Sequence, residues 1–234
     1  MIRSLHVIGA SLFIFLILLH LIRAIWMTSK IISISILTWI ILITGWIIFA
    51  LSMIEGFIGY ILCRGQMSYW GITVMINIVA VLPCCGKVIA ELIRCAAWCI
   101  LNRIFIYHFL IGIVIALMIL IHILFLHNFS SSNPFINNNT SIISSYPFIF
   151  KDYYSSFMTI IFIISIFLYE PDLTSNCDNQ IIANPLSTPH NIVPEWYYLL
   201  FYSCLRSFPD KTIGVIIVLS LLTIFSLHYC SIVM

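Results

Sequence analysis

Four histidines within two strongly apolar stretches are the residues of this chain best suited to chemistry. His6 and His20 are fourteen positions apart, and His108 and His122 repeat that spacing. Along an α-helix, fourteen residues rise about 21 Å and come within roughly 40° of a whole number of turns, so both rings of a pair lie on one side. Imidazole is a metal ligand, and a haem iron can take one imidazole on each face. Two such helices would hold two haems stacked across a bilayer.

Any one of these histidines is also explained as a buried ring bonded to a backbone carbonyl or a serine. Two pairs with the same spacing favour ligation, because ionisable groups at membrane depth are costly and usually functional. A transporter or proton channel that uses membrane histidines as relays is a competing interpretation, and it predicts no haem spectrum.

The composition indicates the class of protein. The 234 residues are 62% hydrophobic and 8% charged, and the mean hydropathy is +1.14. These values predict a polytopic membrane protein and exclude a soluble domain. The net charge of +2 is too small to indicate binding to nucleic acid. The eight cysteines include neither CxxC nor CxxCH, so neither a zinc knuckle nor covalent haem attachment is indicated.

Five apolar stretches are long enough, or nearly so, to cross a bilayer. They are residues 4–23, 37–59, 103–126, 156–168 with their flanks, and 212–231. If the first histidines of the two pairs share a haem, and the second histidines share another, their helices run parallel. Parallel spans need an odd number of spans between them, and residues 37–59 supply one.

The intervening span carries Gly45 and Gly59, again fourteen apart. A glycine lets a flat macrocycle lie close against a helix backbone. Glycines are also ordinary in spanning helices, but the matched spacing favours contact with haem.

Two short motifs accompany the histidine pairs: residues 65–71 read GQMSYWG and residues 194–197 read PEWY. With them, the chain resembles cytochrome b of the mitochondrial and bacterial cytochrome bc complex over nearly its whole length. The resemblance implies an all-α polytopic transmembrane helix bundle of about five spans, enclosing two non-covalently bound b-type haems. The chloroplast relative fits less well, because one of its histidine pairs is fifteen apart.

The resemblance implies roles for the haem-binding residues. The iron ligands would form two pairs, the first near the positive side of the membrane and the second near the negative side: His6 with His108, and His20 with His122. Arg3 and Arg23 would neutralise haem propionates, because buried anions need charge-assisted partners.

It also implies two quinone sites. Quinol would be oxidised on the positive side by a pocket that includes Met53, Phe57, Gly71, Pro194, Glu195, Tyr198 and Tyr202. Of these, Glu195 and Tyr202 are expected in catalytic roles. Glu195 would take a quinol proton, since a partly apolar pocket raises the pKa of a carboxyl group toward working pH. Quinone would be reduced on the opposite side by His127 and Asp152, with Lys151 in a binding role. His127 ends the third span and Asp152 begins the fourth, so both belong to one membrane face.

The implied activity is that of a ubiquinol–cytochrome c reductase subunit coupled to proton translocation. Implied partners are a Rieske-type iron–sulfur protein, a cytochrome c-type subunit, other subunits and a second copy in a homodimeric complex. The expected location is the mitochondrial inner membrane, or alternatively a bacterial plasma membrane. Residues 1–127 would form the di-haem part with the quinol-site surface helices, and residues 128–234 the quinone-site part with the PEWY loop and last span.

The chain departs from the family pattern in several places. The family has a spanning helix before the residue matching Met1 and two more spans after residue 231. The sequence is therefore a partial chain, a chain completed by other polypeptides, or an unusually reduced protein. Cys63 and Arg64 replace the usual Pro-Trp, and His190 is shifted by one position. A degenerate structural subunit, which keeps the fold without quinol turnover, remains an alternative.

Overall fold

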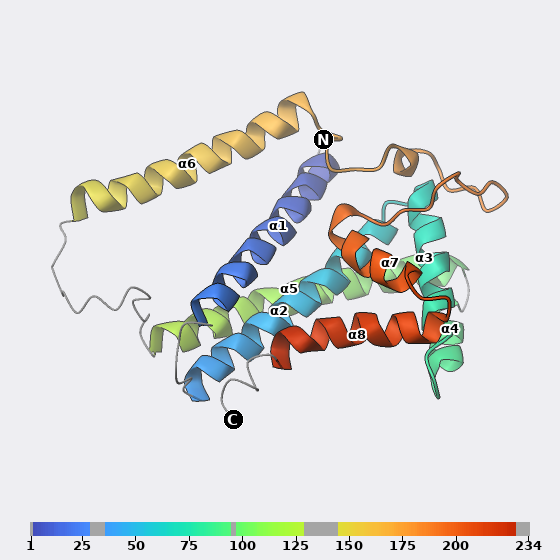
Figure 1. Ribbon diagram of the computed structural model, residues 1–234. Coiled ribbons are helices and arrows are strands. Elements are labelled where there is room, and N and C mark those ends of the chain that lie inside the picture. The colour runs from blue at the N-terminus through green and yellow to red at the C-terminus, as the bar shows by residue number, and fades with distance from the viewer. Residues whose placement is uncertain (1, 29–35, 95–96, 129–144, 228–234) are drawn as a thin grey trace. The chain divides into compact units, whose positions relative to one another are not determined.

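The computed structural model describes residues 2–28, 36–94, 97–128 and 145–227, and every regular element in these ranges is helical (Figure 1). The long helices are α1 (Ile2–Thr28), α2 (Ile36–Ile61), α5 (Ala97–Asn128) and α6 (Ser145–Tyr169). The shorter ones are α3 (Gln66–Val79), α4 (Gly86–Arg94), α7 (Leu199–Arg206) and α8 (Lys211–Leu227), with 3-10 turns η1 (Cys177–Gln180) and η2 (Trp196–Tyr198). The predicted all-α, multi-span fold is confirmed.

Within the described ranges, four helices are long and apolar enough to cross a membrane: Ile2–Trp26, Thr38–Ile61, Leu101–Asn128 and Ser145–Tyr169. They correspond to the first four predicted spans, and the fourth begins well before residue 156. The fifth predicted span is represented by α8, whose apolar stretch Lys211–Leu221 is shorter. The remainder of that span, beyond residue 227, lies outside the described residues.

The chain divides into two compact units. The first contains residues 1–30 and 130–175, in which α1 contacts α6. The second contains residues 31–129 and 176–234, with all the other elements. His6 and His20 therefore belong to the first unit, and His108 and His122 to the second, so the pairing of histidines between helices stays a prediction.

In the second unit, α2 and α5 pack along their lengths in antiparallel register. An added Cβ at Gly59 would touch His108, Glu55 lies against Gly112, and an added Cβ at Gly45 would touch His122. Moving toward the N-terminus of α2 by a given number of residues therefore corresponds to moving toward the C-terminus of α5 by the same number. Small residues that let helix backbones approach closely are the usual basis of helix pairing in a bilayer, where no hydrophobic force acts between helices.

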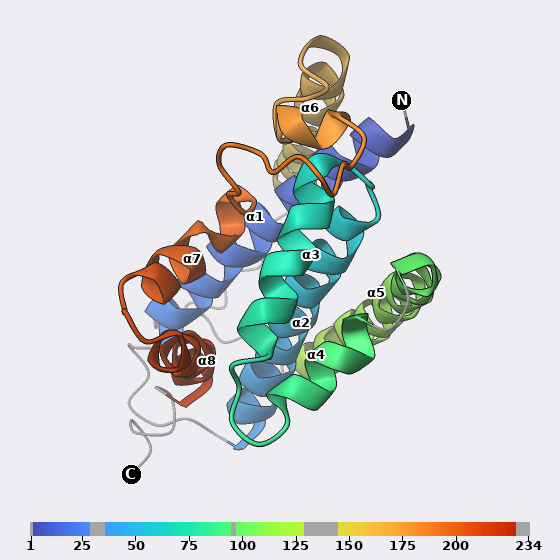
Figure 2. The ribbon, with the colours of Figure 1, turned by 90° about the vertical axis from the view of Figure 1, so that its right-hand side faces the viewer.

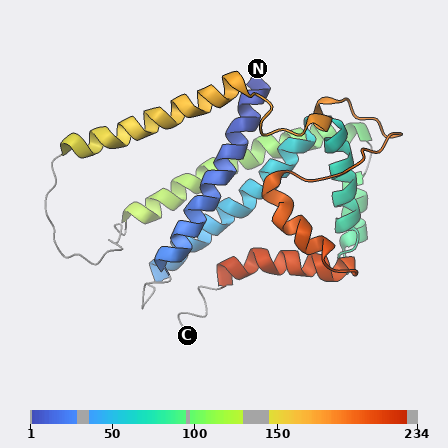
Figure 3. The ribbon, with the colours of Figure 1, turned by 45° about the horizontal axis from the view of Figure 1, so that its top comes forward.

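Helices α3 and α4 lie at one end of this pair (Figure 1), whereas α8 contacts α2. Figure 2 shows α3 and α4 following the end of α2 and preceding α5. In Figure 3, α7 turns back into α8, and these two helices pack against each other. An added Cβ at Gly214 would stand 2.9 Å from the Leu205 carbonyl oxygen, so this close turn requires glycine.

Candidate quinone cavity and histidine sites

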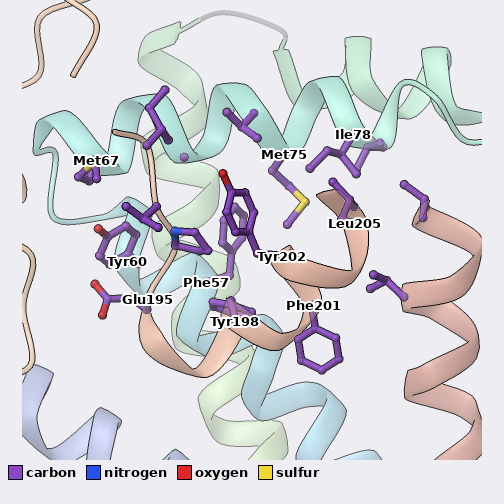
Figure 4. Close-up of a pocket in the computed structure, with 18 of the residues that line it drawn as sticks. Phe57, Tyr60, Met67, Met75, Ile78, Glu195, Tyr198, Phe201, Tyr202 and Leu205 are labelled. Atoms are coloured by element: carbon purple, nitrogen blue, oxygen red, sulfur yellow. The ribbon is translucent and has the colours of Figure 1, made fainter. Parts of the chain in front are cut away.

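A cavity of about 330 Å³ opens between α3, the η2–α7 segment and α8 (Figure 4). Its walls are apolar side chains with few polar groups, which is the usual make-up of a site for a small organic ligand. The lining residues include Phe57, Tyr60, Gly71, Met75, Pro194, Glu195, Tyr198, Phe201 and Tyr202.

The segment that precedes PEWY is attached to the start of α3 by hydrogen bonds over a long sequence separation. The Gln66 side chain donates to the Ser187 carbonyl at 3.1 Å and accepts from the Asn184 N–H at 3.0 Å. The Asn179 Oδ1 accepts from the Ser68 N–H at 3.0 Å. We call this set of contacts the α3 latch. It holds residues 179–187 at the start of α3, and so fixes where the PEWY loop begins.

The α3 latch explains the glycine of GQMSYWG. A Cβ at Gly65 would stand 2.1 Å from the Asn179 carbonyl oxygen, a separation that no side chain can have. Arg64, just before it, adopts a left-handed φ of 59°. The backbone therefore turns sharply here, and Gly65 gives the loop room to approach.

On the other side of the cavity, PEWY is attached to α2. The Tyr198 hydroxyl donates to the Met53 carbonyl, and its ring meets the Phe57 ring edge to face at 6.4 Å. Burial raises the pKa values of both Tyr197 and Tyr198, so these phenols stay neutral donors.

Glu195 brings the one carboxyl group among the residues that line the cavity (Figure 4). Its side chain is half-buried, and burial raises its pKa above the ordinary carboxyl value. The Tyr60 hydroxyl beside it offsets part of that rise. That hydroxyl is itself buried and makes no well-formed hydrogen bond to the part of the chain described here. The two groups together give the apolar wall a place that can accept or donate a proton.

Of the seven residues predicted for quinol oxidation, six line this cavity, and Met53 lies behind it as the acceptor for Tyr198. A Cβ at Gly71 would meet nothing within 4 Å, so this glycine faces open space in the cavity wall. The Tyr202 hydroxyl is 3.4 Å from Arg206, whose guanidinium carbon is 5.5 Å from the Tyr202 ring centroid. The structure thus brings these residues together, and their catalytic roles stay predictions.

The second arrangement lies on the α2–α5 pair. His108 and His122 both face α2, where Cβ atoms at Gly59 and Gly45 would stand 2.8 Å and 3.2 Å from their Cε1 atoms. The His122 Nδ1 is 2.8 Å from Thr44 Oγ1, and the His108 Nδ1 is 3.0 Å from Glu55 Oε1.

These contacts fit histidines that bind haem iron. Because Nδ1 of each ring meets a side chain of α2, Nε2 is the nitrogen that would bind the metal. The glycines provide the space that the two rings occupy, which the side chain of any other residue would fill.

The remaining predicted residues lie on separate elements. His6 and His20 lie fourteen residues apart on the continuous helix α1, and both are exposed, as are Arg3 and Arg23. His127 is exposed in the last turn of α5, and Lys151 and Asp152 are exposed on α6. Because α5 and α6 belong to different units, the grouping of His127 with Lys151 and Asp152 into one quinone-reduction site stays a prediction.

Three residues that the structure places at these sites are not among those predicted from the sequence. Glu55 and Thr44 contact the histidine rings, and Tyr60 lies beside Glu195. Glu55 had a readable signal, because it is an acidic residue well inside an apolar span. Thr44 and Tyr60 are unremarkable in such a sequence.

The family pattern described as Cytochrome b/b6/petB matches residues 1–130, and the pattern described as Cytochrome b(C-terminal)/b6/petD matches residues 182–231. A curated relative, cytochrome b of Trichophyton rubrum, is 39% identical over 240 residues, which cover 98% of this chain and 60% of the relative. The chain therefore spans well under two thirds of that relative's length. A solved structure titled Hyperthermophilic respiratory Complex III has a similar fold, with a TM-score of 0.80 at 24% identity, over 97% of this chain and 62% of the other.

Proposed function

The chain belongs to the cytochrome b/b6 family, and on that premise we propose that it is the electron-transferring subunit of a quinol–cytochrome c oxidoreductase. Its substrate would be a ubiquinol-type quinol, oxidised in the cavity between α3 and α7. Two b-type haems, when bound, would supply the one-electron chemistry that carries electrons across the bilayer.

The observation that carries the proposal is Glu195 in the wall of an apolar cavity. The 330 Å³ volume and the apolar lining suit a quinone ring, and the aromatic side chains offer it stacking surfaces. Quinol oxidation releases protons, so the site needs a group whose pKa lies near working pH. Burial moves the pKa of Glu195 in that direction.

The haem ligands would be His108 and His122 of α5 with His6 and His20 of α1. The glycine positions and the engaged Nδ1 atoms support the two ligands on α5. With two imidazoles on each iron, no coordination position is left for oxygen, which suits electron transfer. Arg3 and Arg23 would pair with the propionates.

A second quinone site, for reduction, would use His127, Lys151 and Asp152. Two cationic or ionisable groups and a carboxylate can bond quinone oxygens and deliver protons. The proposed partners are a Rieske-type iron–sulfur protein, a cytochrome c-type subunit and a second copy of the assembly. The membrane would be the mitochondrial inner membrane or a bacterial plasma membrane.

The test is quinol–cytochrome c turnover of the purified complex carrying Glu195→Gln. Loss of a general base typically costs a hundredfold or more, so we expect kcat/KM to fall by about 10²-fold. Glu91→Gln makes the same change on the exposed face of α4 and is the matched control. Unchanged turnover in Glu195→Gln would contradict the proposal, as would the absence of a reduced-minus-oxidised haem spectrum in the wild-type complex.

A further inference from the structure

Glu55 is the only acidic residue of α2 and α5, and it lies deep within the apolar span Thr38–Ile61. Its side chain is 18% exposed, and Oε2 is buried with no hydrogen-bond partner in the described part of the chain. Oε1 lies 3.0 Å from Nδ1 of His108. An acidic group at this depth is costly and persists only with a partner or a purpose.

The residues around Glu55 leave space for its carboxylate to reach His108. A Cβ at Gly112 would stand 3.3 Å from Oε1, so the glycine provides the space in which the carboxylate reaches across to α5. Gly59, one turn further along α2, lies against the same ring, whose Cε1 would be 2.8 Å from a Cβ built there. The Nδ1–Oε1 distance is short enough for a polar contact between a neutral imidazole N–H and the carboxylate, although the ring N–H is not aligned with Oε1 for a straight hydrogen bond.

The second histidine of α5 has a different kind of partner. The Nδ1 of His122 lies 2.8 Å from the hydroxyl oxygen of Thr44. That hydroxyl also lies 2.9 Å from the carbonyl oxygens of Ile40 and Ile41, to which it donates. Its remaining lone pair can then accept the ring N–H. One histidine therefore faces a carboxylate, and the other faces a neutral hydroxyl.

We propose that Glu55 is a positioning residue for His108, and that its carboxylate lowers the midpoint potential of the haem that this histidine would bind. A carboxylate beside Nδ1 orients the His108 ring with Nε2 toward the iron and makes the imidazole a stronger electron donor than the Thr44 hydroxyl can make His122. Stronger donation and a nearby negative charge stabilise ferric over ferrous iron, so the haem bound by His108 would have a lower midpoint potential than the same site without the carboxylate. The inference rests on the proposed function, because it requires His108 and His122 to bind haem iron.

The experiment is a potentiometric titration of the b-type absorbance in the purified complex, with low-temperature electron paramagnetic resonance of the ferric haems. Glu55→Gln keeps the size of the side chain and removes its charge, and Glu55→Ala removes the acceptor. Thr44→Val is the matched variant for the other histidine. We expect both Glu55 variants to raise the midpoint of one component, by about tenfold in its reduction equilibrium, or about 59 mV for one electron. Thr44→Val should move only the other component.

The outcomes separate the two proposals. Two components in the wild type, neither moved by Glu55→Gln or Glu55→Ala, would overturn the role of Glu55 and leave the proposed function standing. Equal movement of both components in Glu55→Gln would also overturn it, because the effect would then be general to the fold. A wild-type complex with no b-type component would overturn the proposed function, and this inference with it.

Discussion

The imidazole ring of His122 lies against the backbone of α2 at Gly45, with its Cε1 atom 3.2 Å from where a Cβ would stand. The corresponding distance between His108 and Gly59 is 2.8 Å. Each ring therefore takes space that exists only because glycine has no side chain. Matched pairs of this kind tie the glycine spacing of one helix to the histidine spacing of the next.

Adding a methyl group at either glycine should displace the facing histidine. At 2.8 Å the Gly59→Ala methyl cannot be accommodated in place, whereas at 3.2 Å the ring facing Gly45→Ala must give by only a few tenths of an ångström. We expect Gly59→Ala to lower stability by about 1–3 kcal/mol and to lose more b-type absorbance than Gly45→Ala. Haem content per complex and thermal melting measure both effects.

Gly9→Ala is the control for that series, since nothing lies within 4 Å of a Cβ built there. It should retain full haem content and gain up to about 1 kcal/mol from helix propensity. Equal haem loss in all three variants would contradict the role of the close contacts.

A side chain at Gly71 should enter the cavity without disturbing the fold. Its Cβ position has open space around it, and α3 accepts alanine or valine at small cost. We expect Gly71→Val to keep the melting temperature near the wild-type value while KM for quinol rises. A large fall in stability with unchanged KM would show that Gly71 packs against protein and not against ligand.

The pH dependence of stability should reveal the buried carboxyl group of Glu195. Its folded-state pKa is raised by burial, so folding favours the protonated form. Its contribution to stability is therefore fully present below the ordinary carboxyl pKa and is lost as pH rises through the folded value. The glutamine of Glu195→Gln cannot ionise. The melting temperature of this variant should therefore increase relative to that of the wild type as pH rises from about 4 to 8. A constant difference across that range would contradict the raised pKa.

Breaking the α3 latch should loosen the cavity loop. Asn179→Ala removes the acceptor for the Ser68 N–H and leaves this donor of the first helical turn without its side-chain partner. An unsatisfied buried donor lowers the free energy of unfolding by about 1–3 kcal/mol. The loop that carries PEWY should also be held less firmly against the start of α3. Thermal melting and KM for quinol measure the two consequences.

Asn184→Ala is the matched control for the latch. Asn184 donates to Gln66 through its backbone N–H, which alanine retains, and its side chain accepts from the exposed Leu186 N–H. It should change stability by less than about 0.5 kcal/mol, as ordinary surface substitutions do. A loss of stability equal to that of Asn179→Ala would mean that any substitution in this loop is destabilising, and would contradict a specific role for the α3 latch.

Much of the framework could be predicted from the sequence because it depends on periodicity. Runs of apolar residues predict the first four spans. The shared spacing of fourteen singles out the two glycines and the two histidines, but only the packed helices show that Gly45 faces His122 and Gly59 faces His108. Helical geometry repeats, so equal spacings on two packed helices bring their residues into register.

The parts that could not be predicted depend on contacts without periodicity. Gln66 bonds to Asn184 and Ser187 across more than a hundred positions, through loop backbone whose path no local pattern specifies. The position of Tyr60 beside Glu195 follows from that path. Glu55 is different, because its charge within an apolar span is visible in the sequence, but its partner His108 becomes evident only from the packing of α2 on α5.

The antiparallel register of α2 and α5 also determines where the chain can change length. One residue inserted between Gly45 and Gly59 would turn one of these glycines about 100° away from its histidine and present a side chain in its place. The same insertion in the connection between α4 and α5 would leave both glycine–histidine contacts intact. Tolerance to insertion and deletion should therefore be lowest between the two glycines and between the two histidines, even at positions that touch neither the cavity nor a metal ligand.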